Sequence, residues 1–151
     1  MKLAVSSDEQ VPLTDHVIDW LKQHGHEVVL CGALKGKPEW WPRASQELAE
    51  LVAAGECEQG ILFCYTGTGA SIAANKVPDI RAALCVDAQT ATGARRWNHA
   101  NVLTMGYRNT TETVADEILA AWFVAPLGVG EDEEAVGQVA EIERKYSRSN
   151  E

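Results

Sequence analysis

Hydrophobic residues along the chain alternate between short unbroken runs and longer stretches with helical spacing. The unbroken runs, which predict strands, occupy residues 2–5, 27–30, 60–63, 81–84 and 101–105. The stretches with helical spacing occupy residues 13–24, 44–54, 71–76, 89–97, 111–123 and 131–148. In the first of these stretches, Leu13, Val17, Trp20 and Leu21 share one helical face, and Gly25 follows as a C-cap.

This alternation of strands and helices predicts an α/β fold. Strands that are apolar throughout are typical of a parallel sheet with helices on both faces. We therefore expect a doubly wound, Rossmann-like three-layer sandwich of about five parallel strands, with residues 1–151 forming a single domain. Residues 126–130 interrupt the pattern before the last helix, which predicts that this helix packs away from its own core.

The composition of the chain indicates which kinds of partner it binds and in which cellular compartment it works. The 151 residues are 46% hydrophobic and 23% charged, with a formal net charge of −9. This excess of acidic residues argues against a nucleic-acid partner, which needs a basic face. The chain shows no signal peptide and no apolar stretch long enough for a membrane span, so we expect a cytoplasmic protein without membrane contact.

The cysteines show no metal-binding arrangement. Cys31, Cys57, Cys64 and Cys85 are spread along the chain without a CxxC pair or a Cys/His ligand spacing. In a cytoplasmic protein we expect them to be free thiols, three of them buried and inert. The sequence therefore predicts no metal site.

The turn after the third predicted strand carries the candidate chemistry. Residues 64–71 (CYTGTGAS) join an apolar strand to a helix, and two glycines one residue apart allow backbone N–H groups to converge on an anion. A thiolate at Cys64 beside such donors would be able to remove a proton next to a carbonyl while the donors hold the enediolate oxygen. The alternative is an ordinary glycine-rich turn with a core cysteine, and spacing alone does not decide between them.

A longer stretch around this turn resembles a known family. Residues 60–76 (GILFCYTGTGASIAANK) are similar to the signature of the ribose-5-phosphate isomerase type B and galactose-6-phosphate isomerase family. The similarity continues through residues 80–85 (IRAALC), 97–103 (WNHANVL) and 106–108 (GYR), and it spans nearly the whole chain from Ser7 to Glu143.

The resemblance implies an aldose–ketose isomerase that works through a cis-enediolate. One branch of the family uses a cysteine at the Cys64 position as the base, whereas another uses a glutamate at the Ala70 position, which this chain lacks. Thr66 matches a threonine that assists ring opening or proton handling. The resemblance further assigns the backbone donors to Gly67, Thr68, Gly69, Ala70 and Ser71, and active-site roles to Asp8, Asn98 and the phosphate-facing Arg108.

Several family positions are changed in this chain. The histidine that follows the active-site aspartate is Glu9, and the ring-opening histidine falls at Trp97. His99, two residues later, and Glu9 are the candidates to replace that catalytic histidine. Phosphate-binding arginines fall at Glu131 and Ala135. A phosphate dianion would lose charge-assisted contacts there, so we expect a short, open-chain or unphosphorylated sugar.

Other changes involve aromatic residues near the predicted site. The family's Asp-Tyr-Pro motif reads Trp40-Trp41-Pro42 and is followed by Arg43. Trp40, Trp41 and Trp97 are candidates for a flat apolar wall against a sugar, and Arg43 for an anion contact. The alternatives are a subunit contact for the tryptophans, a structural histidine for His99 and a solvated helix-start residue for Arg43.

The resemblance also implies an assembly. Family members are homodimers or tetramers whose site is shared between two subunits, with the last helix extending to a partner subunit. No metal or organic cofactor is implied, because a thiolate and backbone donors suffice for the proton transfer. Two further functions stay open: a non-catalytic or half-site subunit of a hetero-oligomeric isomerase, and a sugar-binding module without turnover.

Overall fold

The computed structural model describes residues 1–147, and within them five parallel strands form one sheet in the order β2-β1-β3-β5-β4. The strands are β1 (Lys2–Ser7), β2 (Glu27–Gly32), β3 (Gln59–Cys64), β4 (Ala82–Leu84) and β5 (Val102–Gly106). The helices are α1 (Pro12–Gln23), the short 3₁₀ helix η1 (Ala33–Lys35), α2 (Trp41–Ala53), α3 (Thr68–Ala74), α4 (Ala88–Asn98), α5 (Glu112–Val124) and α6 (Glu131–Tyr146).

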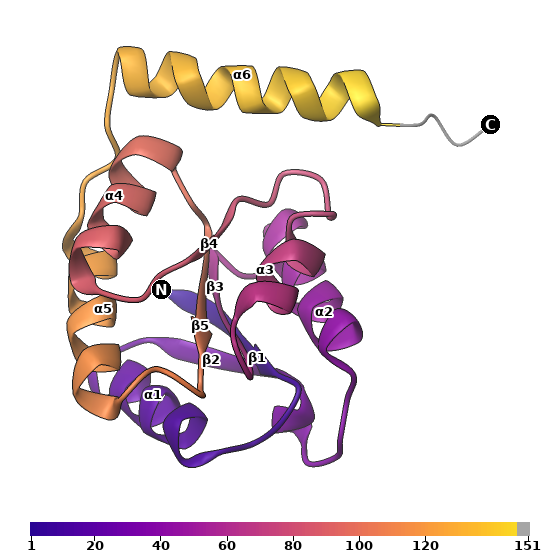
Figure 1. Ribbon diagram of the computed structural model, residues 1–151, viewed down its shortest axis with the longest axis vertical. Helices are drawn as coiled ribbons and strands as arrows, with labels where there is room; N and C mark the ends of the chain where they lie inside the picture. The colour runs from indigo at the N-terminus through magenta and orange to yellow at the C-terminus, as the bar shows by residue number, and fades with distance from the viewer. Residues whose placement is uncertain (148–151) are drawn as a thin grey trace.

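The sheet is covered on both faces, which confirms the predicted three-layer α/β fold. Figure 1 shows α1, α4 and α5 on one face and α2 and α3 on the other. Side chains alternate between the two faces along each strand, so that Phe63 packs towards α1, α4 and α5 whereas Leu62 packs towards α2 and α3. Both are almost completely buried, and the central strands β1, β3 and β5 therefore form the middle of two hydrophobic cores.

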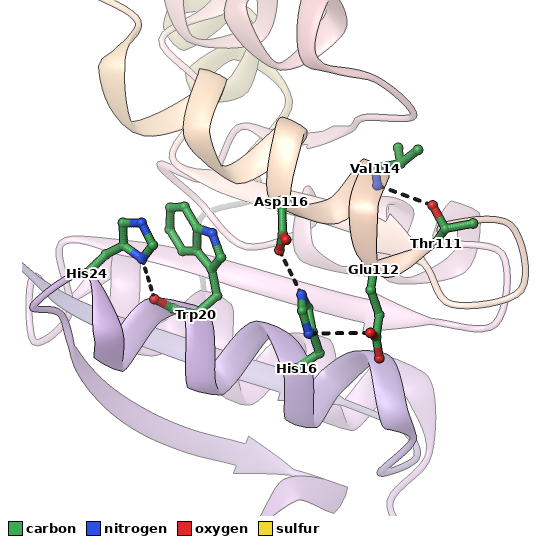
Figure 2. Close-up of polar contacts among 7 residues, drawn as sticks. All are labelled: His16, Trp20, His24, Thr111, Glu112, Val114 and Asp116. Carbon is green, nitrogen blue, oxygen red and sulfur yellow. Dashed lines mark hydrogen bonds and ion pairs between the residues drawn. The ribbon is translucent and has the colours of Figure 1, made fainter.

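Helices α1 and α5 are joined by a polar contact across their outer surfaces. His16 in α1 places Nε2 2.7 Å from a carboxylate oxygen of Asp116 and Nδ1 3.6 Å from one of Glu112, both in α5 (Figure 2). Thr111 caps the N-terminus of α5, because its hydroxyl accepts a hydrogen bond from the Val114 amide. These contacts fix the start of α5, which follows the loop after β5.

Helix α6 lies apart from the two cores, as the break in the sequence pattern predicted. It contains no buried residue, and Figure 1 shows it as an arm beyond α4. Helix α6 contacts the rest of the molecule near Asp79. The Asp79 amide donates to both carboxylate oxygens of Glu143 at 3.1 Å. The predicted end of this helix at Arg148 lies outside the described residues. Within residues 1–147, no helix has the length and hydropathy that crossing a bilayer requires.

Several boundaries differ from those predicted, and most of the differences lie at the carboxyl ends of the strands. Strands β1, β2 and β3 continue one or two residues further towards that edge than their apolar runs. Helix α3 begins at Thr68 rather than residue 71, because Gly67 adopts a left-handed conformation (φ 79°) that turns the chain directly into the helix. Helix α2 begins at Trp41 rather than residue 44, since Pro42 is favourable in a first helical turn.

Candidate active site

The carboxyl ends of β1, β3 and β5 lie side by side at the edge where doubly wound sheets bind their ligands. From β1 the chain passes to β2 on one side, and then crosses to β3 on the other. Ligands bind at such a switch point, outside the carboxyl ends of the strands. Asp8 follows β1, Cys64 ends β3 and Tyr107 follows β5, so the sheet order alone brings these three residues to one edge.

The Cys64 sulfur is held by the backbone of the turn that follows it. The Gly67 amide donates a hydrogen bond to Sγ at 3.2 Å, and Cys64 is 5% exposed. The loop after β5 packs against this turn through Gly106, where an added Cβ would lie 2.6 Å from the Thr66 carbonyl. Only glycine permits that approach, which presses the two loops together around the sulfur.

The turn also presents backbone donors. Ser71 donates its amide to the Gly67 carbonyl, so the amides of Thr68, Gly69 and Ala70 point out of the N-terminal end of α3. The Thr66 hydroxyl lies 2.7 Å from that of Thr68. Of the five predicted donor residues, Gly67 and Ser71 therefore have their amides engaged within the turn, and Thr68, Gly69 and Ala70 keep theirs for a ligand.

A cavity of about 630 Å³ opens beside this turn. Its lining comprises Asp8, Glu9, Gln10, Ala33, Gly36, Lys37, Pro38, Glu39, Trp40 and Trp41. Cys64 and Thr66 are not among the lining residues, but the Trp41 ring lies 3.1 Å from where a Cβ on Gly69 would be, so the wall of the cavity contacts the donor turn. Three carboxylates and one lysine give the lining an acidic character, next to two indole rings.

Two tyrosines connect the charged residues at this edge. The Tyr107 hydroxyl donates to Asp8 Oδ1 at 3.0 Å, and Arg108 Nη1 donates to the Tyr65 hydroxyl at 3.0 Å. The two tyrosine rings meet edge to face, with centroids 5.8 Å apart. Burial and the hydrogen bond to Asp8 raise the pKa of Tyr107 well above its ordinary value. Sequence reasoning missed both tyrosines as site residues, although their positions after β3 and β5 pointed to this edge.

The remaining predicted residues lie elsewhere. Trp97 and Asn98, at the end of α4, line a second cavity of about 680 Å³ that also contacts α6 and shares no lining residue with the first. His99 adopts φ 47° as the C-cap of α4, and its Nε2 lies 2.7 Å from the Gly128 carbonyl oxygen. Arg43 donates to Gln46 along the exposed side of α2. Within one chain, the structure brings these residues together with neither Cys64 nor Asp8.

The other three thiols lie in the cores, as predicted, and Cys64 itself lies at the border of one of them. Cys31, Cys57 and Cys85 are each 1% exposed, and burial raises the pKa of Cys31 and of Cys85 to about 12. A thiol with such a pKa is a poor nucleophile and base at neutral pH. Among residues 1–147, no three His, Cys, Asp or Glu side chains converge to hold a metal ion.

Comparison with known proteins shows which family the chain resembles. The model of a family described as Ribose/Galactose Isomerase matches residues 3–139. Ribose-5-phosphate isomerase B of Escherichia coli K12 is 34% identical over 95% of this chain and 97% of its own, and D-erythrulose-4-phosphate isomerase of Pectobacterium atrosepticum is 35% identical over 83% and 84%. The solved structure of Clostridium thermocellum ribose-5-phosphate isomerase B superimposes with a TM-score of 0.92 at 40% identity, covering 97% of this chain and 100% of that one.

Proposed function

The chain belongs to the Ribose/Galactose Isomerase family, and we propose that it is an aldose–ketose isomerase in which Cys64 carries the proton between two adjacent carbons of a short sugar. The observation that supports this most directly is the contact between the Cys64 sulfur and the Gly67 amide, at the start of the turn that presents backbone donors. The same amide belongs to the residue that precedes α3, so the sulfur and the backbone donors are held by one continuous piece of backbone.

The proposed reaction needs no redox partner. The Cys64 thiolate removes a proton from the carbon next to the carbonyl, and the electron pair of that C–H bond moves to give a cis-enediolate. The amides after Gly67 hold the enediolate oxygen. The Cys64 thiol then returns the proton to the neighbouring carbon. A second proton moves from the substrate hydroxyl oxygen to the former carbonyl oxygen, and Thr66, whose hydroxyl lies in this turn, carries it.

Asp8 completes the groups that one chain contributes. Its carboxylate lines the cavity and one of its oxygens is occupied by Tyr107. We assign the other oxygen to a substrate hydroxyl, so that Asp8 aligns the reacting carbons with Cys64. Correct alignment of bound reactants is worth a large part of an enzyme's rate.

The character of the cavity supports a substrate without a phosphate at the end that enters it. Asp8, Glu9 and Glu39 would repel a dianion there, with Lys37 as the opposing charge in the lining. Carboxylates accept hydrogen bonds from sugar hydroxyls, and the Trp41 ring offers an apolar face to the C–H groups of a sugar. A short, open-chain or unphosphorylated sugar fits these groups. The P. atrosepticum relative is named for a four-carbon sugar phosphate, which supports a short carbon chain and not the absence of a phosphate.

We also propose a homo-oligomer with a shared site. Helix α6 has no buried residue, and Val139, Ile142 and Tyr146 on it are 50–73% exposed. Trp97, Asn98 and His99 lie at the end of α4 beside this helix. In such an assembly α6 extends to a partner subunit, and the end of α4 from one subunit completes the Cys64 site of the other.

Proton exchange in deuterated water tests the activity. The purified protein is incubated with C4 to C6 aldoses and ketoses, each free and phosphorylated, and NMR follows deuterium at the carbon next to the carbonyl. We expect exchange and isomerisation with a short neutral sugar. Exchange with phosphorylated sugars only would contradict the substrate assignment. No exchange by the folded oligomer would favour the half-site subunit or the sugar-binding module.

A further inference from the structure

We propose that Tyr107 is a positioning residue that orients the Asp8 carboxylate for the isomerase reaction, with Tyr65 and Arg108 holding the Tyr107 ring in place. The inference rests on the proposed function, because it concerns how the same site aligns its substrate. It assigns a role to two tyrosines that directly follow β3 and β5.

The Tyr107 side chain reaches across three strand ends. It starts after β5, and its hydroxyl donates to Asp8, which follows β1, at 3.0 Å; β3 with Cys64 lies between these two strands. Its backbone is fixed as well, since the Tyr107 amide donates to the Cys64 carbonyl at 3.1 Å. One residue therefore connects the chain of the proposed base to the carboxylate that we assign to the substrate.

Tyr65 supports this arrangement from the other side. Its ring meets the Tyr107 ring edge to face, and the Arg108 guanidinium lies 5.5 Å from the Tyr65 ring centroid and donates to its hydroxyl. The Arg108 amide also donates to the Tyr65 carbonyl at 2.9 Å. Aromatic pairs of this geometry stabilise a structure by more than their buried area alone would give. The contact with Tyr65 therefore restrains the orientation of the Tyr107 ring.

The chemistry of Tyr107 suits positioning rather than proton transfer. Burial, the hydrogen bond to Asp8 and the nearby acidic groups Asp8, Glu9 and Cys64 raise its pKa far above neutrality. The phenol therefore keeps its proton across the working range and stays a donor. A permanent donor on Oδ1 restrains the Asp8 carboxylate, and Oδ2 keeps its capacity to accept a hydrogen bond from a substrate hydroxyl.

A double-mutant cycle tests the inference. Tyr107→Phe removes the hydroxyl and retains the ring, and it is made in the wild-type and the Asp8→Ala backgrounds, with kcat and KM measured for the sugar that the wild type exchanges. We expect Tyr107→Phe to lower kcat about tenfold with KM within about twofold, and to have no effect on kcat in the Asp8→Ala background. Thr111→Ala removes a cap hydrogen bond outside the site and serves as the control for a general loss of stability.

The outcomes separate the two proposals. If the wild type exchanges no sugar, the proposed function fails and this inference with it. If the wild type is active but Tyr107→Phe keeps its kcat, or lowers kcat equally with and without Asp8, only the positioning role is overturned. A tenfold loss in Thr111→Ala as well would overturn it too, because the effect would then follow stability. The free energy of unfolding is also measured for the wild type, Tyr107→Phe, Asp8→Ala and the double variant. It reports whether the Tyr107–Asp8 hydrogen bond forms, independently of turnover.

Discussion

The indole ring of Trp41 packs against Gly69, with two ring carbons 3.1 Å from the position that a Cβ on the glycine would take. Trp41 begins α2 and Gly69 lies in the first turn of α3, so this contact joins the aromatic wall of the cavity to the turn that carries the backbone donors. The tryptophan therefore has a fixed place beside the proposed enediolate site, although 41% of it is exposed.

Gly69→Ala is expected to disturb this wall. The new methyl group must push the Trp41 ring outwards, and overpacking of this kind costs about 1 kcal/mol or more of unfolding free energy. Because the ring borders the cavity, we also expect KM to rise several-fold. Urea unfolding and initial rates measure the two effects. Gly137→Ala, in a helix with nothing within 4 Å of its Cβ, should instead raise the unfolding free energy by about 0.5–1 kcal/mol.

Cys64→Ala is expected to abolish proton exchange. Removal of a general base lowers the rate by about 10²–10⁴-fold, and KM should change little because the donor turn and Asp8 remain. Deuterium incorporation at the carbon next to the carbonyl is the readout. Cys85→Ala is the matched control, since Cys85 is buried like Cys64 but lies after β4, and it should lose stability while retaining exchange. Unchanged turnover in Cys64→Ala would refute the assigned base.

Glu47 stabilises the segment between β2 and α2, and we expect this stabilisation to be lost at acid pH. It accepts hydrogen bonds from Lys35 Nζ at 2.7 Å and from the Gly32 amide at 2.9 Å, and so holds the turn that continues into the cavity lining. Burial, the largest single influence, raises its pKa, but the hydrogen bonds and the charge of Lys35 outweigh it and hold the pKa below the ordinary 4.5. Its contribution to stability is therefore complete above pH 4.5 and is lost as the pH falls through the lowered value.

Glu47→Gln tests that contribution. At pH 7 the variant should lose about 1 kcal/mol of unfolding free energy, since it gives up hydrogen bonds to a charged but partly exposed carboxylate. Below pH 4.5 its stability should fall less steeply than that of the wild type. Thermal unfolding between pH 3 and pH 7 measures both. Glu50→Gln, on the exposed side of the same helix, is the control. Parallel curves for wild type and Glu47→Gln would contradict the assignment.

Much of the fold followed from the sequence because the pattern of apolar runs carries it. Each predicted strand and helix is present, and the break before the last helix correctly separated α6 from the cores. The order of the strands did not follow, since apolar runs carry no information on which strand lies beside which. The early start of α3 was missed as well, because glycine ordinarily weakens a helix, whereas Gly67 here provides the left-handed residue before it.

The site was predictable only where it is local. Cys64, Thr66 and the donors up to Ser71 are adjacent in sequence, and they form one turn in the structure. The hydrogen bond from Tyr107 to Asp8 joins residues 99 positions apart, and it exists because β1 and β5 both lie beside β3. The family resemblance assigned substrate-binding roles to individual residues such as Asn98. It did not reveal that Asn98 would line a second cavity. Asn98 and its neighbours at the end of α4 stay predictions.

Ile142→Glu tests that assembly. Ile142 is 60% exposed on α6, and a glutamate there would place a charge in an apolar contact between subunits. We expect a lower molecular mass in solution by light scattering and loss of most isomerase activity, because the end of α4 would no longer reach the Cys64 site of another subunit. The monomer should keep its far-UV circular dichroism, since α6 contributes no buried residue to either core.

Arg144→Glu is the control. It introduces the same side chain at an exposed position of the same helix that lines neither cavity, and it should leave the mass unchanged. Full activity in a monomeric Ile142→Glu protein would show instead that one chain holds the whole site, and would confine the reaction to Cys64, Thr66, Asp8 and the cavity beside them.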